Sequence, residues 1–202
     1  AFDWKPCNPE KVNSACANEV WGTPCKKILD ESEGDKVYDF FTGWLDIIVD
    51  EIKGFKVDGV QIPFIFRLFH ENTGGWYWWG TDTYDDADTC SDAEYKALFN
   101  FTQDYIHSHG LHNILWEYAP AKPSQDYDSA FHDRYPGSDR IDIIAFDRYD
   151  YDYSYAEDIL DDCRVVAEFA HEHNKLAAIG ETGIFNGVQD ETTSYKDWYY
   201  TD

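Results

Sequence analysis

The stretch FIFRLFHENTGGWYWWG, residues 64–80, changes character in its middle. Its first part is an apolar run interrupted only by Arg67, and such a run is typical of a strand buried in a sheet. His70 and Glu71 end the run, and a glycine pair and three tryptophans follow within the next eight residues. We therefore expect a core strand that ends in an imidazole and a carboxylate, with aromatic rings beside them.

Predicted strands and helices alternate along the rest of the chain. Strands are predicted at 60–69, 113–118, 141–146 and 176–179, and helices at 35–53, 91–108 and from 154 to about 173. Ser91 with Glu94, and Ser154 with Glu157, match the capping-box pattern of a helix start. Near-continuous apolar strands that alternate with helices indicate a parallel sheet covered by helices on both faces. The pattern predicts one α/β domain, either an open doubly wound sheet or part of a (β/α)8 barrel.

Polar side chains follow each predicted strand at its carboxyl end. In parallel α/β folds the loops at that edge surround one mouth, where ligands bind. We therefore expect the residues at the four strand ends to share one pocket. They are His70, Glu71, Glu117, Asp147, Tyr149 and Glu181.

Glu71 and Glu181 lie at the ends of different predicted strands and form the candidate catalytic pair. Two carboxylates can flank a glycosidic bond: one is protonated and gives its proton to the leaving oxygen, while the other is ionised and attacks the anomeric carbon. In retaining enzymes the two groups lie about 5 Å apart, a distance that neighbouring strand ends can supply. The alternative is that each glutamate is an exposed loop residue or half of a structural ion pair.

Three further side chains have roles that the pattern leaves open. Arg67 lies inside a buried strand and needs a partner charge, so we expect it to orient a catalytic carboxylate. The Tyr149 phenol either holds a carboxylate in its ionised form or bonds to the backbone. His70 could bind a metal, carry a proton or hydrogen-bond to a carboxylate or a sugar hydroxyl. The hydrogen bond is favoured, because His70 and Glu71 would point to opposite faces if the strand continued through both.

The loop after Glu71 leaves two interpretations of its aromatic residues. Trp76, Trp78 and Trp79 either fold under their own loop or form a surface on which a sugar ring stacks. Trp76 is favoured for a sugar contact because it is nearest to Glu71. The acidic segment at 82–92 could bind calcium, although it lacks the ligand spacing of a known calcium loop.

The composition excludes several classes of partner. A net charge of −24 repels nucleic acids and anionic membranes, and no window approaches the ~18 consecutive apolar residues of a membrane span. An aromatic content of 18% suits stacking against a neutral, polyhydroxylated ligand. Five cysteines without zinc-site spacing favour disulfides, and together with the dispersed acid they predict a secreted, extracellular protein. We expect a monomer that needs no metal and no cofactor.

Several motifs resemble glycoside hydrolase family 26, the family of β-mannanases. RLFHENTGGWYWWG at 67–80, FDRY at 146–149 and IGETG at 179–183 occur in the order found in that family. The segments DWKPCNP at 3–9 and RYPGSDRIDIIAFDRY at 134–149 are also similar to the family, and the resemblance covers about residues 3–190.

The resemblance implies a (β/α)8 TIM barrel that cleaves β-1,4-mannosidic bonds with retention. By the match, Glu71 is similar to the family's acid/base and Glu181 to its nucleophile. The other matching residues would bind the sugar next to the scissile bond or support the nucleophile. They are His70, Trp76 and Tyr149 for sugar binding or support, with Arg67 and Asp147 as supporting residues.

Two departures from the family pattern stand out. Lys5 follows Trp4 where the family usually has a histidine, which questions the sugar contact from this segment. The chain also has 202 residues, whereas a full barrel needs about 250. We therefore expect residues 1–202 to be a single catalytic barrel domain that covers only about strands 3 to 7 and is incomplete at both ends.

The leading hypothesis is a retaining endo-β-1,4-mannanase that hydrolyses mannan, glucomannan or galactomannan, or mannooligosaccharides, by double displacement. One alternative is another retaining β-glycanase, acting on mixed-linkage glucan or xylan. A second alternative, from a different class, is a non-catalytic carbohydrate-binding barrel that keeps the aromatic groove. A metal-dependent hydrolase is the most distant alternative.

Overall fold

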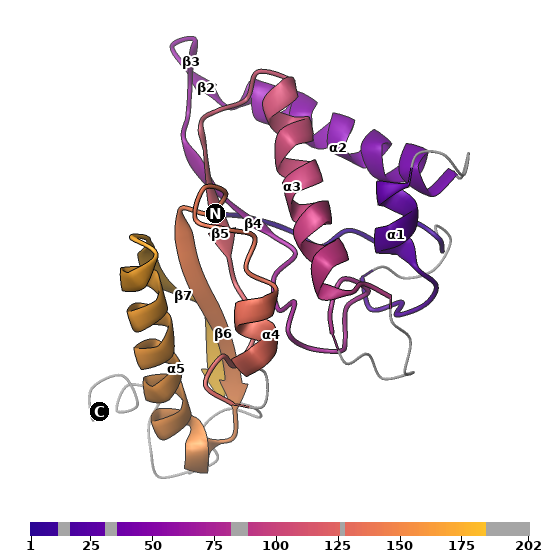
Figure 1. The fold of residues 1–202 in the computed structure, drawn as a ribbon. Helices are drawn as coiled ribbons and strands as arrows, with labels where there is room; N and C mark the ends of the chain where they lie inside the picture. Colours follow the sequence, from indigo (N-terminus) through magenta and orange to yellow (C-terminus); the bar gives the residue numbers. More distant parts are fainter. Residues whose placement is uncertain (12–16, 31–35, 82–88, 126–127, 185–202) are drawn as a thin grey trace.

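The computed structural model describes residues 1–11, 17–30, 36–81, 89–125 and 128–184 (Figure 1). The segment considered for calcium binding, 82–92, lies mostly outside these residues. The helices and strands in chain order are β1 (Phe2–Trp4), α1 (Pro24–Leu29), α2 (Lys36–Gly54), β2 (Lys56–Val57), β3 (Val60–Gln61), β4 (Phe64–Leu68), α3 (Asp92–Ser108), β5 (Ile114–Tyr118), α4 (Asp128–Asp133), β6 (Ile143–Asp150), α5 (Asp152–Glu172) and β7 (Leu176–Ile184).

Five strands form one parallel sheet in the order β1-β4-β5-β6-β7. The strands of this sheet are neighbours in the order in which they occur in the chain, and helices connect them (Figure 1). β2 and β3 form a separate antiparallel pair. The curled parallel sheet is the arrangement of part of a (β/α)8 barrel, as the sequence predicted.

Helices cover one face of the sheet. In β5, Trp116 is buried and its ring contacts Phe99 of α3, whereas Leu115 points to the other face and is 42% exposed. Leu176 in β7, which the register places on the same face as Leu115, is 64% exposed. Successive side chains of a strand point to opposite faces, so one face of the described sheet lacks a helical cover. The prediction of helices on both faces is wrong for the described residues, and a one-sided cover is typical of a barrel wall.

The apolar stripes of the helices supply most of the core under that face. α2 and α3 repeat apolar residues at three- and four-residue steps, and each turns this stripe toward the sheet or the neighbouring helix. The buried residues of the two helices include Phe41, Leu45, Ile48, Val49, Ile52, Tyr95, Leu98, Phe99 and Ile106.

The strand predicted at 60–69 is two separate elements. β3 ends at Gln61 and pairs with β2, and the turn between them contains Asp58 and Gly59 with φ values of 51° and 80°. β4 begins only at Phe64, directly after Pro63, which has no N–H to donate to a strand ladder. Proline therefore breaks an apolar run that looks continuous in the sequence.

The last two strands are longer than predicted. The register pairs Asp147 with Glu181 and Tyr149 with Gly183, so the candidate residues lie within paired strands rather than after their ends. The predicted helix start at Ser154 is wrong, because α5 begins at Asp152 with Tyr151 as its N-cap residue. Ser154 Oγ instead donates to the carbonyl of Tyr151 at 3.4 Å.

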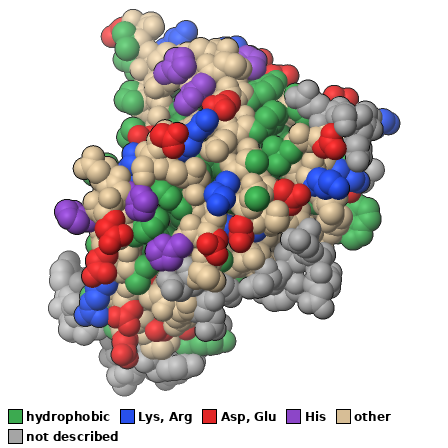
Figure 2. Space-filling model, viewed as in Figure 1, with side chains coloured by type: hydrophobic (Ala, Val, Ile, Leu, Met, Phe, Trp, Pro, Cys, Tyr) green, Lys and Arg blue, Asp and Glu red, His purple; other side chains and the backbone are tan. Residues whose placement is uncertain are grey.

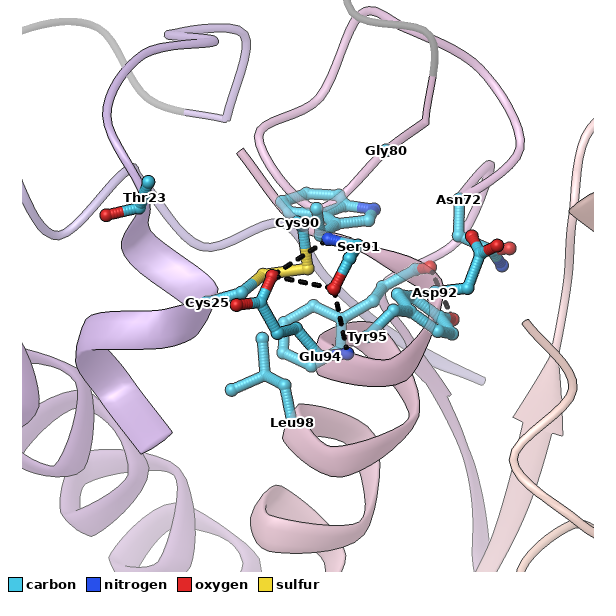
Figure 3. The surroundings of a disulfide bond; sticks show 12 residues. Thr23, Cys25, Asn72, Gly80, Cys90, Ser91, Asp92, Glu94, Tyr95 and Leu98 are labelled. Atoms are coloured by element: carbon cyan, nitrogen blue, oxygen red, sulfur yellow. Dashed lines mark hydrogen bonds between the residues drawn. A yellow bond between two sulfur atoms is a disulfide. The ribbon is translucent and has the colours of Figure 1, made fainter. Parts of the chain in front are cut away.

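A disulfide joins two segments that are 65 residues apart. Cys25 of α1 is bonded to Cys90, immediately before α3 (Figure 3). Ser91 caps α3 through the predicted capping box, in which its Oγ accepts the Glu94 N–H and its own N–H donates to Glu94 Oε2 at 2.9 Å. The disulfide therefore holds α1 against the start of α3, and the sequence prediction of disulfides is confirmed for this pair.

The surface carries its acidic side chains in a dispersed pattern. Figure 2 shows carboxylates scattered over the viewed face, with basic and apolar side chains between them. Among the described residues, no helix has both the length and the apolar character needed to cross a membrane.

Candidate active site

The chain turns sharply where β4 ends. Leu68 is the last residue of the strand, and Phe69 and Glu71 both have φ values of 50°, a region that residues other than glycine seldom adopt. The Glu71 N–H donates to the carbonyl of Ala119, just beyond β5, at 2.7 Å. Because the strand stops at Leu68, the condition under which His70 and Glu71 would point to opposite faces is not met. Backbone conformations of this kind concentrate at functional sites.

Arg67 is the centre of a buried charge cluster. Its guanidinium lies 2.7 Å from Glu181 Oε1 and forms an ion pair with Asp147. It also lies 3.3 Å from Asp3 Oδ1 and 3.3 Å from Glu117 Oε1. The Glu117 contact is not aligned for a hydrogen bond, so its attraction is electrostatic. The prediction that a buried Arg67 must be paired is confirmed, since one guanidinium contacts four carboxylates.

Glu181 of β7 accepts hydrogen bonds from two side chains. Arg67 Nη1 donates to Oε1 at 2.7 Å, and the Tyr149 hydroxyl donates to Oε2 at 3.1 Å. Both donors favour the ionised carboxylate. Burial and the nearby Glu181 charge raise the pKa of Tyr149 to about 12, so its phenol keeps its proton at neutral pH. Of the two roles left open for Tyr149, the structure shows the contact with a carboxylate.

Glu71 has a different partner. The indole Nε1 of Trp76 donates to Glu71 Oε2 at 2.7 Å. The Trp76 ring lies so close to Gly74 that a Cβ at that position would overlap the ring. The glycine pair after Glu71 therefore allows Trp76 to fold back onto the carboxylate.

The other two tryptophans of the loop are structural. Trp78 and Trp79 are fully buried, and their indole nitrogens donate to the carbonyls of Pro6 and His70 at 3.0 and 2.8 Å. The two interpretations of the aromatic loop thus apply to different residues, because Trp78 and Trp79 fold under the loop while Trp76 contacts Glu71.

The two glutamates act on the same neighbours. Both carboxylates contribute to raising the pKa of Asp147, of Tyr77 and of Tyr149, after the larger effect of burial in each case. Glu71 and Glu181 therefore both lie near the same three side chains. Every site residue predicted from the sequence lies in this cluster: Arg67, His70, Glu71, Trp76, Asp147, Tyr149 and Glu181.

Asp147 differs from the other carboxylates of the cluster. Burial raises its pKa to about 8 against the attraction of Arg67, and the charges of Glu71 and Glu181 add to the rise. Its Oδ1 is buried and has no hydrogen-bond partner within the described parts of the chain. One guanidinium shared among four carboxylates does not offset the burial of Asp147, so the pKa of Asp147 lies above its usual range.

Sequence reasoning gave no role to Asp3 or Tyr77, and it noted Lys5 only as a departure from the family pattern. Asp3 of β1 is paired in register with Arg67 and lies 3.1 Å from Nδ1 of His70. Lys5 lies 3.6 Å from Asp3 and interacts with the Tyr77 hydroxyl, which belongs to the aromatic loop. β1 has only three residues, too few to show a periodic pattern, so no sequence signal identified Asp3 as part of the pocket.

Three groups in the pocket have the atoms to bind a metal. Asp3, His70 and Glu181 offer ligand atoms that lie within 4.8 Å of one another. Arg67 Nη1, however, lies 3.3 Å from Asp3 Oδ1 and 2.7 Å from Glu181 Oε1. A cation bound there would be repelled by the guanidinium, so this arrangement favours an ion-pair cluster over a metal centre.

The fold and the site together define a class of protein. A parallel β/α wall with carboxylates, an arginine and aromatic rings at the carboxyl ends of its strands is typical of a (β/α) barrel with its pocket at that edge. Comparison with known proteins then gives the family. The model of glycosyl hydrolase family 26 matches residues 1–202, and the chain belongs to this family.

Two of the relatives that match the chain share one description. A mannan endo-1,4-beta-mannosidase of Bifidobacterium adolescentis is 32% identical over 158 residues, which cover 74% of this chain and 15% of that protein. A mannan endo-1,4-beta-mannosidase of Bacillus subtilis is 34% identical over 145 residues, covering 70% of this chain and 37% of its own length. The chain thus spans well under half of these curated relatives.

A solved structure agrees with the fold. The catalytic domain of an endo-beta-1,4-mannanase of this family from Bacillus sp. JAMB-750 superposes with a TM-score of 0.80 at 30% identity. The alignment covers 98% of this chain and 50% of that domain. The similarity confirms the predicted barrel class and the resemblance drawn from the motifs.

Proposed function

We propose that the chain carries the catalytic centre of a retaining endo-β-1,4-mannanase. The main support is the pair of glutamates in one pocket, each with partners suited to a different role. Family membership and the description of the curated relatives support mannan as the substrate class. The natural substrates in this proposal are mannan, glucomannan and galactomannan.

Glu181 is the nucleophile in this proposal. Arg67 and Tyr149 donate to its two oxygens, and these two hydrogen bonds fix the orientation of the attacking carboxylate. In the first step a Glu181 oxygen attacks the anomeric carbon and forms a glycosyl–enzyme ester as the glycosidic C–O bond breaks. A water molecule then attacks the same carbon and releases the carboxylate.

Glu71 is the general acid and then the general base. In the first step it gives its proton to the departing glycosidic oxygen, and in the second it takes a proton from the attacking water. The Trp76 N–H donates to Oε2 of Glu71 and can orient this carboxyl group toward the sugar. The other oxygen of Glu71 can then transfer the proton. The two displacements at one carbon give net retention of configuration.

Exchanging each glutamate for its amide tests the assignment. Glu71→Gln and Glu181→Gln should each lower the release of reducing ends from galactomannan by about 10²–10⁴-fold, with Glu51→Gln on exposed α2 as the control. An aryl mannoside with a dinitrophenyl leaving group needs no proton from the enzyme, so Glu71→Gln should still form the glycosyl–enzyme on it. Glu181→Gln should fail with both substrates. Undiminished turnover in either amide variant would contradict its assigned role.

The stereochemical course is a separate test. NMR of the first product formed from a β-linked mannooligosaccharide should show the β-anomer before mutarotation, because two inversions restore the starting configuration. Initial release of the α-anomer would contradict the double displacement and indicate a single inversion by water.

A substrate panel separates the alternatives. Faster turnover of mixed-linkage glucan or xylan than of mannan would assign the site to another β-glycanase. Mannan binding without any release of reducing ends would favour a non-catalytic carbohydrate-binding barrel. Loss of activity on treatment with a chelator, restored by a divalent cation, would support the metal-dependent alternative.

We further propose that the protein acts as a secreted monomer and that residues 1–202 belong to one catalytic barrel domain. The disulfide between Cys25 and Cys90 supports an oxidising compartment. Activity in the culture medium rather than in cell extracts, and a monomeric mass in light scattering, are the expected results. A larger assembly or retention in the cytosol would contradict these two points.

A further inference from the structure

Lys5 lies beside the candidate nucleophile without a role in the proposed reaction. The register of β1 places Trp4 opposite Leu68, so Lys5 stands level with the turn that carries His70 and Glu71. Its ammonium lies 3.6 Å from Asp3 Oδ2, and its side chain is 43% exposed. It also contacts the Tyr77 hydroxyl, whose ring stacks on Trp79 at 4.6 Å. Two oriented partners therefore hold a charged group at the rim of the pocket.

The pocket contains many more acids than permanent cations. Among the described residues of the cluster, Arg67 and Lys5 are the only side chains with a permanent positive charge, and Arg67 is already shared by four carboxylates. Several buried carboxylates around one guanidinium are incompletely compensated. The Lys5 ammonium, which lies beside Asp3, adds a second positive charge and so reduces the excess of negative charge in the cluster.

The path from Lys5 to Glu181 is short. The carboxylates of Asp3 and Glu181 offer oxygen atoms within 4.8 Å of one another, and Lys5 Nζ lies 3.6 Å from Oδ2 of Asp3. Burial works to lower the pKa of Lys5, but the neighbouring Tyr77, Asp3 and Glu181 outweigh burial and raise it. Lys5 in turn helps to hold the pKa of Asp3 below its usual value, as do His70 and Arg67, against the effect of burial.

We propose that Lys5 is a positioning residue, which supplies the second fixed positive charge of the site and offsets the repulsion between the carboxylates of Asp3 and Glu181. The effect of Lys5 on kinetics rests on the proposed function. The electrostatic coupling between Lys5 and Glu181 does not depend on it. The charged and titratable groups that face this cluster from each element are Asp3, Arg67, His70, Glu71, Tyr77, Glu117, Asp147, Tyr149 and Glu181.

The first test needs no catalytic activity. In the complete gene product, with whatever sequence adjoins residues 1–202, unfolding free energies are measured for Lys5→Gln, Glu181→Gln and the double variant. We expect a favourable coupling between the two positions that weakens in high salt, because an exposed ammonium is screened. The same cycle with Lys53→Gln is the matched control, since Lys53 is 45% exposed and lies 3.7 Å from Asp50. Additive effects of Lys5→Gln and Glu181→Gln would overturn the proposal.

The second test uses the pH dependence of kcat/KM on galactomannan. Lys5→Gln should move the acidic limb of the profile upward by about 0.5–1 pH unit, whereas Lys5→Arg should restore it, because only the charge is required. Lys53→Gln should leave the profile unchanged. A Lys5→Gln variant that raises KM with an unmoved acidic limb would assign Lys5 to substrate binding and overturn the positioning role. If the wild-type protein cleaves no glycan, the proposed function fails while the coupling measurement still decides the role of Lys5.

Discussion

At the level of single residues, the pocket divides similar side chains into different chemical states. Glu181 receives hydrogen bonds from Arg67 and Tyr149, and Glu71 receives one from Trp76. Asp147 is buried, and its Oδ1 has no hydrogen-bond partner among the residues that the structure describes. The three groups are all carboxylic acids, so their differences come from burial and from the charges around them. The state of Asp147 has a consequence for stability.

Asp147 should make the protein less stable as pH rises toward 8. Its folded pKa of about 8 lies above the unfolded value of 3.8, so its contribution to stability is fully present below about pH 4 and is lost as pH rises through about 8. Asp147→Asn places a neutral side chain at this position, so the unfolding free energy of the variant should fall less between about pH 5 and pH 8 than that of the wild type. Each unit of difference between the folded and unfolded pKa of Asp147 contributes up to about 1.4 kcal/mol to the fall in the wild type. Chemical denaturation across this range measures the slope.

The exposed Asp50 provides the control for this measurement, because Asp50→Asn at 81% exposure should leave the slope unchanged. An equally steep slope in wild type and Asp147→Asn would contradict a raised pKa of Asp147 in the folded protein.

At the level of elements, the loop after β4 acts as one unit with two functions. Its buried tryptophans anchor it to the core, and Trp76 turns back to Glu71. Trp78 and Trp79 each fill a buried site and donate to a backbone carbonyl, which fixes the position of the loop. The loop can therefore hold the Trp76–Glu71 hydrogen bond in a defined geometry.

Gly74→Ala should disturb this arrangement. The new Cβ would overlap the Trp76 ring, so the indole must move and give up its hydrogen bond to Glu71. Loss of a hydrogen bond to a charged group is worth about 1.5–3 kcal/mol, and we expect kcat/KM to fall by about 10–100-fold. Steady-state kinetics with galactomannan, together with Trp fluorescence, would detect the change.

The comparison variant is Gly43→Ala in α2, where a Cβ meets no atom within 4 Å. It should keep full activity and gain up to about 1 kcal/mol of stability from helix propensity. If Gly74→Ala behaves like Gly43→Ala, the close approach of Trp76 does not matter for catalysis.

At the level of the whole molecule, the described sheet has one face under helices and free edges at β1 and β7. Apolar side chains such as Leu115 and Leu176 remain exposed on the other face. That a complete barrel contains about three further strands stays a prediction from the family resemblance. Within the described part, the Cys25–Cys90 bond is the covalent link between α1 and the segment before α3.

Removing this link should lower stability considerably. For a loop closed by a bond 65 residues apart, the chain-entropy estimate is about 4 kcal/mol. Cys25→Ala with Cys90→Ala should therefore lower the unfolding free energy by about 2–5 kcal/mol, measured by denaturant titration. Cys163→Ala, at a thiol outside any disulfide, is the control. A double variant as stable as wild type would show that the bond contributes nothing.

The sequence determined the local structure and the chemistry of its residue types. Capping of α3 by Ser91 and Glu94, the helix stripes and the order of strands all depend on neighbours close in the chain, so their patterns were visible. The predicted break points failed where one residue overrode a pattern, as Pro63 did in the run at 60–69 and Tyr151 did at the start of α5.

Only the tertiary structure decided which of these residues meet. The register of β1 and β4 places Asp3 beside Arg67, and Asp3 in turn lies between Lys5 and Glu181. The Trp76 ring folds over Gly74, whereas Trp78 and Trp79 are buried in the core. These contacts join residues far apart in the chain, and a burial-dependent quantity such as the pKa of Asp147 exists only after the sheet has formed. The sequence determines which residues carry a charge. The energies of their interactions depend on distance and on the exclusion of water, and both are set only when the chain folds.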